Sequence, residues 1–230
     1  MQDVQPTYEM PPPATLYGHI ASALGEWFDP QGVQFAICFS FLKRAQEVES
    51  TILLSEAGGK LEVPNAPPKV LEGNVNPFTR EVLFEPRMTL YLNQPQWKEA
   101  FLHPRYAVAL GRSQDLFCYR EVSLVNLIPV SSAYLENTLL PYSMARRIGR
   151  GQVVTMPRLL DLEHKRKPSF ERYLVLRNRS SSKEWLSFPD DPPLQLWADP
   201  QSVKESGDEP QGIIFLTWSP EENGNPTTLA

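Results

Sequence analysis

Residues 33–41 alternate strictly between large apolar side chains and small or polar ones, and this pattern constrains the fold more than any other feature. The apolar set consists of Val33, Phe35, Ile37, Phe39 and Phe41. Because successive side chains of a strand point to opposite faces, the whole set lies on one face of an extended segment. A face this rich in phenylalanine needs a packed core against it. The sequence therefore predicts a sheet with at least one buried face.

The composition supports such a core. The chain has 230 residues, of which 41% are hydrophobic, and at this length a core forms without a disulfide or a structural metal. Cys38 and Cys118 are far apart and form no C-x-x-C pair, so neither a zinc site nor a redox motif is expected. No apolar run approaches the roughly 18 residues that cross a bilayer, and the N-terminus has no leader pattern. We expect a soluble cytoplasmic protein with no cofactor, no metal and no membrane partner.

Local patterns predict one main helix, a shorter helix at about 96–102 and several strands. After the prolines at 11–13, Thr15 is expected to cap a helix that runs to about Trp27. Its buried face is expected to carry Leu16, Ile20, Ala23, Leu24 and Trp27. Further strands are expected at 51–55, 81–84, 88–92, 106–110, 116–130 with a break, 152–162, 170–178 and 212–218. Residues 56–79 are rich in Gly, Pro and Asn and predict a long loop or an extended arm.

Charge is segregated along the chain, although the net charge is only −5. Residues 143–183 contain 11 Lys and Arg against 3 Asp and Glu, whereas residues 184–230 contain 1 against 9. Because charges are screened beyond about 10 Å, a phosphate responds to local charge. Eight of the 11 cations are arginines, whose planar guanidinium binds phosphate through two parallel hydrogen bonds. The block favours an RNA partner, and pairing of these arginines with the acidic C-terminal segment is the alternative.

Three stretches, in their order and spacing, resemble one known family. The first is PPPATLYGHI (11–20) continuing to LGE (24–26), a proline-rich entry into a helix with Tyr-Gly in its first turn. The second joins TREVL (79–83) to MTLYL (88–92), and the third and most specific is PRYAVALGRSQDL (104–116). Across residues 6–128 the chain is similar to the fifth-numbered family of CRISPR-associated (Cas) proteins, the RAMP-type subunit that caps the 5′ end of the guide RNA in type I Cascade complexes. It looks most similar to the type I-B branch.

The resemblance implies an α+β fold: a ferredoxin-like (RRM-like) RAMP core, a protruding arm and a smaller β-rich C-terminal part. The expected divisions are 1–140 for the core with the arm at about 56–79, 141–218 for the basic β-rich part, and 219–230 for a flexible tail. Such a core needs a strand before the first helix, and only residues 1–10, interrupted by Pro6, offer one. That strand is therefore short or missing, or comes from a segment upstream of this chain.

The resemblance also implies a function in antiviral defence: a non-catalytic RNA-binding scaffold that clamps the 5′ handle of the crRNA. Its implied partners are the crRNA, the backbone subunit and the large subunit of Cascade, with target DNA engaged only indirectly. Use of the complex in guided transposition is the other task compatible with the same subunit.

The expected RNA-binding residues combine this resemblance with the residues themselves. Gly18 in an opening helical turn admits a close phosphate or a tightly packed backbone, and Gly111 ends a strand at a turn where a guanidinium, a hydroxyl and free amides converge on one phosphate. A plain Asp-containing turn is the alternative there. Unstacked bases would lie on rings such as Tyr91 or Tyr142, unless those rings are core. The predicted RNA-binding set is Tyr17, Gly18, Arg80, Arg112, Ser113, Arg146, Arg147 and Arg150.

Two other function classes stay open. One branch of the family cuts precursor guide RNA by a metal-independent, histidine-assisted mechanism, and His103 stands at about the matching position as a general base. The lysine expected beside it is missing, because residues 99–102 are EAFL. We therefore expect no enzyme, with an endoribonuclease acting through His103 as the alternative. The second is a protein-binding adaptor whose basic block pairs with its own acidic tail.

Overall fold

The chain folds as two units whose segments alternate along the sequence. The computed structural model describes residues 4–56, 71–112, 114–190, 194–202 and 209–219. One unit, here the ribbon unit, consists of Met1–Glu9 and Phe41–Arg87, and the other, the sheet unit, consists of Met10–Ser40 and Met88–Ala230.

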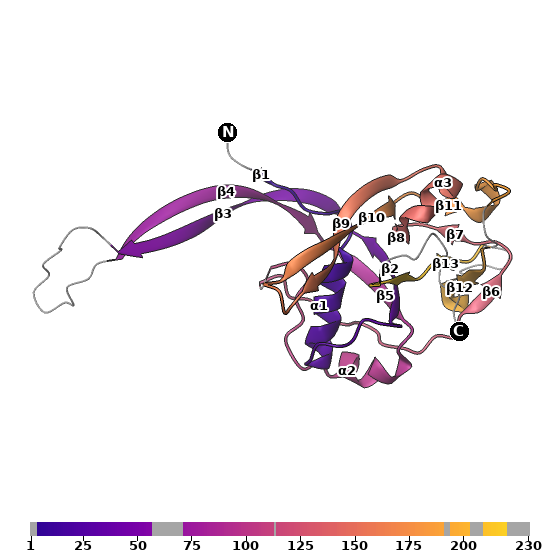
Figure 1. Ribbon diagram of the computed structural model, residues 1–230, viewed down its shortest axis with the longest axis horizontal. Helices are drawn as coiled ribbons and strands as arrows, with labels where there is room; N and C mark the ends of the chain where they lie inside the picture. The colour runs from indigo at the N-terminus through magenta and orange to yellow at the C-terminus, as the bar shows by residue number, and fades with distance from the viewer. Residues whose placement is uncertain (1–3, 57–70, 113, 191–193, 203–208, 220–230) are drawn as a thin grey trace, which may run out of the picture. The chain divides into compact units, whose positions relative to one another are not determined.

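The ribbon unit is built on two long antiparallel strands, β3 (Lys43–Glu56) and β4 (Leu71–Phe84), with β1 (Val4–Gln5) parallel to β4 (Figure 1). Polar contacts support its base, where the Thr7 amide donates to Glu81 Oε2 and Arg44 pairs with Glu9. The register between β3 and β4 has no break over its whole length. β3 and β4 therefore form one continuous antiparallel ribbon.

This ribbon corrects two expectations. The strand expected at 51–55 begins at Lys43, so the polar residues 43–50 before it also belong to the strand. Of the arm expected at 56–79, residues 71–79 belong to β4 and pair with β3, and residues 57–70 lie outside the described residues.

The sheet unit holds the helices and the remaining strands of the described chain. Its elements are α1 (Pro13–Leu24), β2 (Gln34–Ser40), β5 (Arg87–Leu92), η1 (Pro95–Trp97), α2 (Lys98–Leu102), β6 (Ile128–Val130), β7 (Tyr134–Leu135), β8 (Thr138–Pro141), η2 (Tyr142–Met144), α3 (Ala145–Ile148), β9 (Gln152–Asp161), β10 (Lys167–Leu176), β11 (Ser180–Ser181), η3 (Ser182–Glu184), β12 (Leu196–Ala198), η4 (Pro200–Ser202), β13 (Gly212–Ile213) and β14 (Leu216–Thr217). The fold is α+β, with many strands and few helices.

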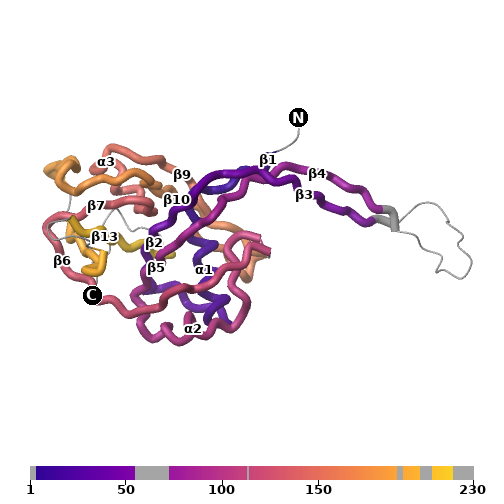
Figure 2. Tube along the Cα trace, turned by 180° about the vertical axis from the view of Figure 1, so that it is seen from behind, coloured from indigo at the N-terminus to yellow at the C-terminus, as the bar shows by residue number. Residues whose placement is uncertain are grey.

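The main sheet has the order β14-β2-β8-β10-β9, with β5 also paired to β2. Two smaller sheets, β13-β12-β6 and β11-β7, complete the unit. Figure 2 shows the same arrangement from behind, with α1 and α2 next to each other. The strand that precedes α1 is β1, which pairs with β4 in the ribbon unit and not with this sheet. The division expected at residue 140 falls within β8, which pairs with both β2 and β10.

β2 is buried on both faces, which the alternation alone did not predict. Phe35 and Ile37 are fully buried as expected, but Gln34 and Ala36 on the opposite face are buried as well. The Trp218 ring lies 4.2 Å from that of Phe35, and its indole N–H donates to the Pro13 carbonyl at 2.8 Å. β2 is therefore a central strand between packed layers.

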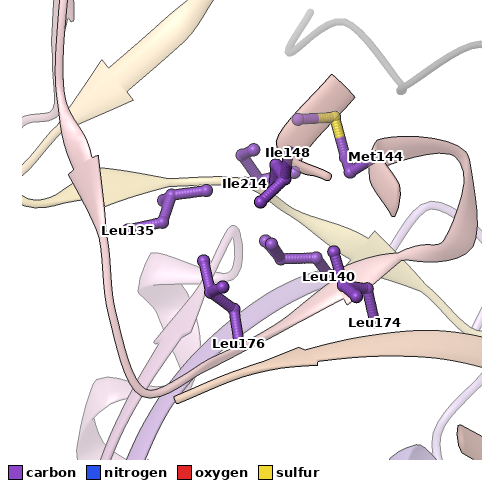
Figure 3. Close-up of a cluster of buried hydrophobic side chains, with 7 residues drawn as sticks. All are labelled: Leu135, Leu140, Met144, Ile148, Leu174, Leu176 and Ile214. Carbon is purple, nitrogen blue, oxygen red and sulfur yellow. The ribbon is translucent and has the colours of Figure 1, made fainter. Parts of the chain in front are cut away.

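A second part of the core lies around β8 and β10. It is formed by Leu135, Leu140, Met144, Ile148, Leu174, Leu176 and Ile214 (Figure 3). These side chains come from strands, from the η2–α3 turns and, for Ile214, from the link between β13 and β14. Burial of their apolar area holds the short helices against the sheet.

α1 begins two residues before the expected cap. Pro12 is its N-cap, and its carbonyl accepts the amides of Thr15 and Leu16. Proline fits the first helical turn because its missing N–H would have no intrahelical partner there. The helix ends at Gly25, so Trp27 lies beyond it and is exposed.

The described residues of the segment 103–127 form no strand, although strands were expected at 106–110 and 116–130. An isolated bridge, Ala109↔Leu116, and the Phe117 amide donating to the Val108 carbonyl join its two arms. Only Ile128–Val130 of the second expected strand pairs in a sheet. The alternating apolar side chains of this segment therefore pack against α1 and α2 and do not accompany strand pairing.

The C-cap of α1 yields a test of this packing. Gly25 has φ +87°, and a Cβ there would lie 2.5 Å from Arg105 Cγ, whereas Gly32 has φ +75° with no described atom within 4 Å. Gly32→Ala is expected to cost about 1–2 kcal/mol from backbone strain alone. Gly25→Ala adds overpacking and should cost about 2–5 kcal/mol. Equal losses of unfolding free energy in urea would contradict the contact between Arg105 and the helix end.

Candidate nucleic-acid interface

Tyr17 is a core residue of α1. Its side chain is 7% exposed, and its hydroxyl donates to the Phe28 carbonyl at 2.5 Å. Its ring stacks on Trp27 with centroids 5.6 Å apart. Burial raises the pKa of Tyr17, and the nearby Asp29 carboxylate adds to the shift. The ring presents no free face for a base, and a place of Tyr17 beside an RNA path stays a prediction.

Gly18, the next residue, faces open space. None of the described atoms lies within 4 Å of a Cβ built at this position. The tight packing contact considered for Gly18 is therefore not observed in the described chain. Close approach of a ligand to this turn stays a prediction.

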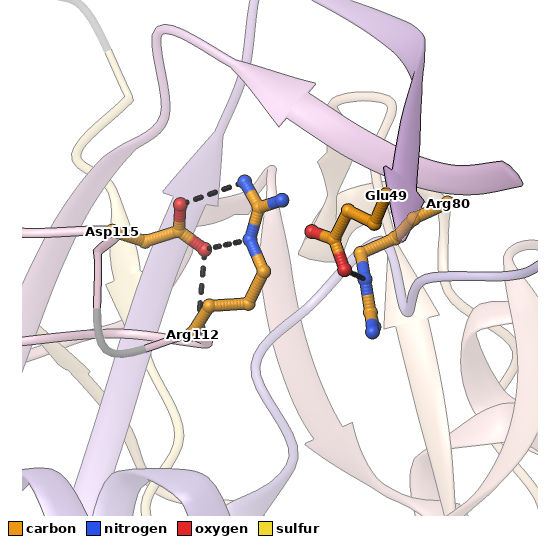
Figure 4. Close-up of polar contacts among 4 residues, drawn as sticks. All are labelled: Glu49, Arg80, Arg112 and Asp115. Atoms are coloured by element: carbon orange, nitrogen blue, oxygen red, sulfur yellow. Dashed lines mark hydrogen bonds and ion pairs between the residues drawn. The ribbon is translucent and has the colours of Figure 1, made fainter. Parts of the chain in front are cut away.

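The turn after Leu110 binds a carboxylate of this same chain, that of Asp115. Asp115 accepts hydrogen bonds from the backbone amide, Nε and Nη2 of Arg112 at 3.1, 2.9 and 2.8 Å (Figure 4). Gly111 has φ +115°, and a Cβ there would lie 3.2 Å from the Asp115 carboxylate. The geometry is that of the Asp-containing turn. Ser113 lies outside the described residues, and a phosphate role for Arg112 stays a prediction.

Asp115→Asn tests whether a second anion also uses this turn. The change keeps the side-chain shape and removes the negative charge from the guanidinium. If Arg112 contacts phosphate, RNA affinity should rise by about 1 kcal/mol, roughly fivefold, because a like charge near the phosphate is removed. Fluorescence anisotropy with a labelled guide RNA measures this. Unchanged affinity in both Asp115→Asn and Arg112→Ala would remove the turn from the interface.

Arg80 lies on β4 of the ribbon unit and is already engaged there. Its Nε donates to Glu49 Oε2 on β3 at 2.9 Å (Figure 4), and its guanidinium lies 5.3 Å from the Phe78 ring. Because Glu49 pairs with Phe78 across the ribbon, these three side chains share one face. Arg80 is therefore a structural cation of the ribbon, and its contact with RNA is untested.

The three arginines expected as a basic stripe differ in their surroundings. Arg146 and Arg147 lie in α3, and Arg150 follows the left-handed Gly149 that ends it. Arg147 is half-buried, and its carbonyl accepts the Leu186 amide at 2.8 Å. Arg150 pairs with Glu184 at 3.0 Å, with both side chains about half exposed. Such exposed pairs contribute only about 0–1 kcal/mol.

Arginines stacked on aromatic rings are the distinctive feature of the basic block. The guanidinium carbon of Arg146 lies 3.7 Å from the Phe188 centroid, that of Arg172 lies 4.0 Å from Tyr142, and that of Arg179 lies 3.6 Å from Tyr134. These distances are well inside the roughly 6 Å range of cation–π attraction. In each stack an exposed arginine lies over a ring, and the ion pairs of the described residues include none of the three.

Sequence reasoning named Arg146 but missed Arg172 and Arg179 as members of this set. The sheet register explains the second stack: Tyr173 pairs with Pro141, so the next step places Arg172 opposite Tyr142. The proximity of residues 30 positions apart follows from pairing of β8 with β10, for which the sequence carries no local signal. A cross-strand guanidinium–ring contact of this kind could be found only after that pairing is known.

Internal pairing with the acidic segment neutralises only part of the block. Arg150–Glu184 and Lys183–Glu209, at 3.0 and 3.6 Å, join the basic block to residues 184–230. Arg146, Arg172 and Arg179 form no ion pair with any residue the structure describes. Their charge is therefore uncompensated within the described chain.

The histidines occupy three different environments. His103 is exposed at the C-cap of α2, and no described tyrosine or lysine is bonded to its ring. His164, on the β9–β10 turn, contacts Asp161 at 2.8 Å and is exposed. His19 is 2% exposed, and its Nε2 lies 2.9 Å from the Tyr119 hydroxyl. Across the described ranges, no cluster of His, Cys, Asp and Glu is placed to hold a metal ion.

The buried His19 predicts how stability depends on pH. Burial lowers the pKa of His19 to about 4, below its ordinary 6.5. Between these values the unfolded chain binds the proton more readily, so stability is lost as pH falls from about 6.5 to 4. Wild type should lose about 2–3 kcal/mol more than His19→Gln over this window. Urea unfolding at several pH values, with the exposed His164→Gln as control, measures the difference, and parallel curves for wild type and His19→Gln would contradict it.

None of the described helices has the length and apolar character that crossing a membrane requires. The chain matches no protein-family model. No curated protein matches it. It is similar to a chain of a solved structure titled "CRISPR RNA-guided surveillance complex", at 14% sequence identity and a TM-score of 0.44, with 80% of this chain and 85% of that chain covered. A likeness at this level assigns no function by itself.

Proposed function

We propose that this protein is a non-catalytic RNA-binding scaffold subunit of a type I CRISPR Cascade effector. In this proposal it clamps the 5′ handle of the crRNA and joins the backbone subunit to the large subunit, and target DNA is engaged through the guide. The observation that carries the proposal is the set of stacked arginines at 146, 172 and 179, which form no ion pair with a residue that the structure describes. The sequence resemblance across residues 6–128 supports the choice of complex.

The stacks suit binding of a single-stranded backbone. A guanidinium that lies flat on a ring keeps its N–H edge directed outward, and that edge matches two phosphate oxygens. Stacking also restricts the side chain before binding, so less conformational entropy is lost when the phosphate arrives. Tyr142 is 39% exposed, so part of its ring remains open to a base.

The finer fold is part of the same proposal. We assign the main sheet and α1 to a ferredoxin-like RAMP core and the β3–β4 ribbon to the arm that pins the handle. The arginines that stack on rings after β8, on β10 and after β10 support a basic C-terminal part in contact with RNA.

The absence of catalysis is also proposed. Histidine-assisted RNA cleavage needs a general base within reach of the attacking hydroxyl and a second group to support the transition state. His103 is exposed, and among the described side chains none is bonded to its ring. This isolation supports a scaffold over an endoribonuclease that acts through His103.

Removal of the stacked arginines tests the proposal. The triple variant Arg146→Gln, Arg172→Gln, Arg179→Gln should weaken guide-RNA binding by about tenfold or more, because hydrogen bonds to charged groups are lost. The slope of log affinity against log salt should fall by about 2, at roughly 0.7 per phosphate contact on a single strand. Fluorescence anisotropy between about 50 and 200 mM salt measures the affinity and its salt dependence. Over this range the affinity that three such phosphate contacts provide changes by about one decade.

The matched control removes the same charge from a different place. Lys165→Gln, Arg166→Gln, Lys167→Gln changes three exposed cations on the β9–β10 turn that stack on no described ring. Equal loss in both triple variants would mean that charge alone, not the stacked geometry, binds RNA. On a denaturing gel the RNA should keep its length, and shortening that disappears in His103→Ala would establish the ribonuclease instead.

A further inference from the structure

A pocket of about 440 Å³ lies in the sheet unit between the end of α2 and the segments 104–108 and 117–119. Its volume is within the range of roughly 300–1,000 Å³ that is typical of small-ligand sites. None of the arginines in the stacked set lines it, so it is separate from the surface described above. We call it the 101–119 pocket.

Aromatic rings form the back of the pocket, and they are held in place. Phe101 and Tyr119 meet edge to face at 5.3 Å, and Phe117 and Tyr119 at 5.7 Å. Behind them, His19 stacks on Phe117 at 4.9 Å, and its Nε2 bonds to the Tyr119 hydroxyl. Because the tyrosine hydroxyl is already satisfied, the pocket offers an ordered apolar wall.

The front of the pocket carries one ring and one charge. Tyr106 is 58% exposed, and the Arg105 guanidinium lies 6.0 Å from its ring centroid. The amides of Arg105 and Tyr106 donate to the Ala23 and Ser22 carbonyls in the last turn of α1, at 3.0 and 3.3 Å. The backbone of both residues is therefore anchored although the side chains are open.

Charge in the pocket is of one sign. Arg105 is the charged residue among those that line it, and it forms no ion pair with a described residue. Its stem packs against Gly25 at the C-cap of α1. Aromatic walls beside an unpaired arginine match a ligand with a flat ring and an anionic group.

We propose that the 101–119 pocket binds a single nucleotide of a single-stranded RNA, with its base against Tyr106 and Phe117 and its phosphate on Arg105. Stacking on a ring accepts any base, so the pocket holds the strand without reading its sequence. The inference rests on the proposed function in one respect, namely that the bound nucleotide belongs to an RNA strand. A free mononucleotide offers the same ring and phosphate to the pocket. The experiment below distinguishes binding of RNA from binding of a mononucleotide.

Cys118 lines the pocket and serves as the probe. Its side chain is exposed, whereas the Cys38 thiol is mostly buried and burial raises its pKa to about 12. The cysteine thiolate attacks iodoacetamide and displaces iodide, so the exposed Cys118 should be alkylated and the buried Cys38 should remain an internal control. Mass spectrometry of the full-length protein follows Cys118 alkylation with no ligand, with an RNA octamer, or with AMP and UMP.

The RNA octamer should slow Cys118 alkylation in wild type by fivefold or more. Tyr106→Ala should lower RNA affinity by about 5- to 150-fold, the range for loss of a base–ring stack, and abolish the protection. Arg105→Gln should abolish the protection too, while Tyr106→Phe, which keeps the ring, should retain it. Leu124→Ala is the matched control, because it truncates an exposed apolar side chain outside the pocket.

The outcomes distinguish the two proposals. RNA that binds by anisotropy without protecting Cys118 overturns the pocket and leaves the proposed function standing. Protection by AMP or UMP with no RNA binding establishes a mononucleotide site and overturns the RNA scaffold. Protection unchanged in both Tyr106→Ala and Arg105→Gln, with unfolding transitions like wild type, also overturns the pocket.

Discussion

Burial of β2 on both faces is the constraint on which the sheet unit depends. β2 pairs with β14, β8 and β5, so three separate parts of the chain take their position from it. Its link to β8 is narrow, a pairing of Cys38 with Thr138, and the Thr138 hydroxyl reinforces it by donating to the Ile37 carbonyl at 2.8 Å. This hydrogen bond is buried, so water does not compete for it.

Two of the stacked arginines, Arg146 and Arg172, lie beside buried residues of the sheet unit. In the turns after β8, Met144 and Ile148 point inward at a spacing of four residues, which leaves Arg146 toward solvent. Arg172 precedes the buried Leu174 by one strand repeat and lies at the edge of the same face. The same apolar burial that closes the core therefore fixes where the cations lie. Aromatic rings, and not carboxylates, then support them, and this preserves a positive field in a chain whose net charge is −5.

The sequence predicted the elements that carry a strong local period. The strand at 33–41, the buried face of α1 and the pair β9 and β10 follow from alternation or helical spacing, and they are confirmed with shifted ends. Predictions that needed tertiary information were wrong or incomplete. Residues 106–110 and 116–127 alternate like strands but form no ladder; Phe117 and Tyr119 instead pack on His19 of α1 and Phe101 of α2. The role of Asp115 as the partner of Arg112 was open because spacing alone does not show which anion a turn holds.

Because the pairing of β3 with β4 has no break, the length of this ribbon can change without changes elsewhere in the protein. Opposed side chains repeat with a period of two residues, so inserting a residue pair in each strand would leave every existing side chain on its present face. Each such step lengthens the ribbon by about 7 Å, since a strand rises about 3.4 Å per residue. The core strands have no such freedom, because their ends are fixed by neighbours. Evolution can therefore alter the span of this element in fixed increments while the rest of the molecule stays unchanged.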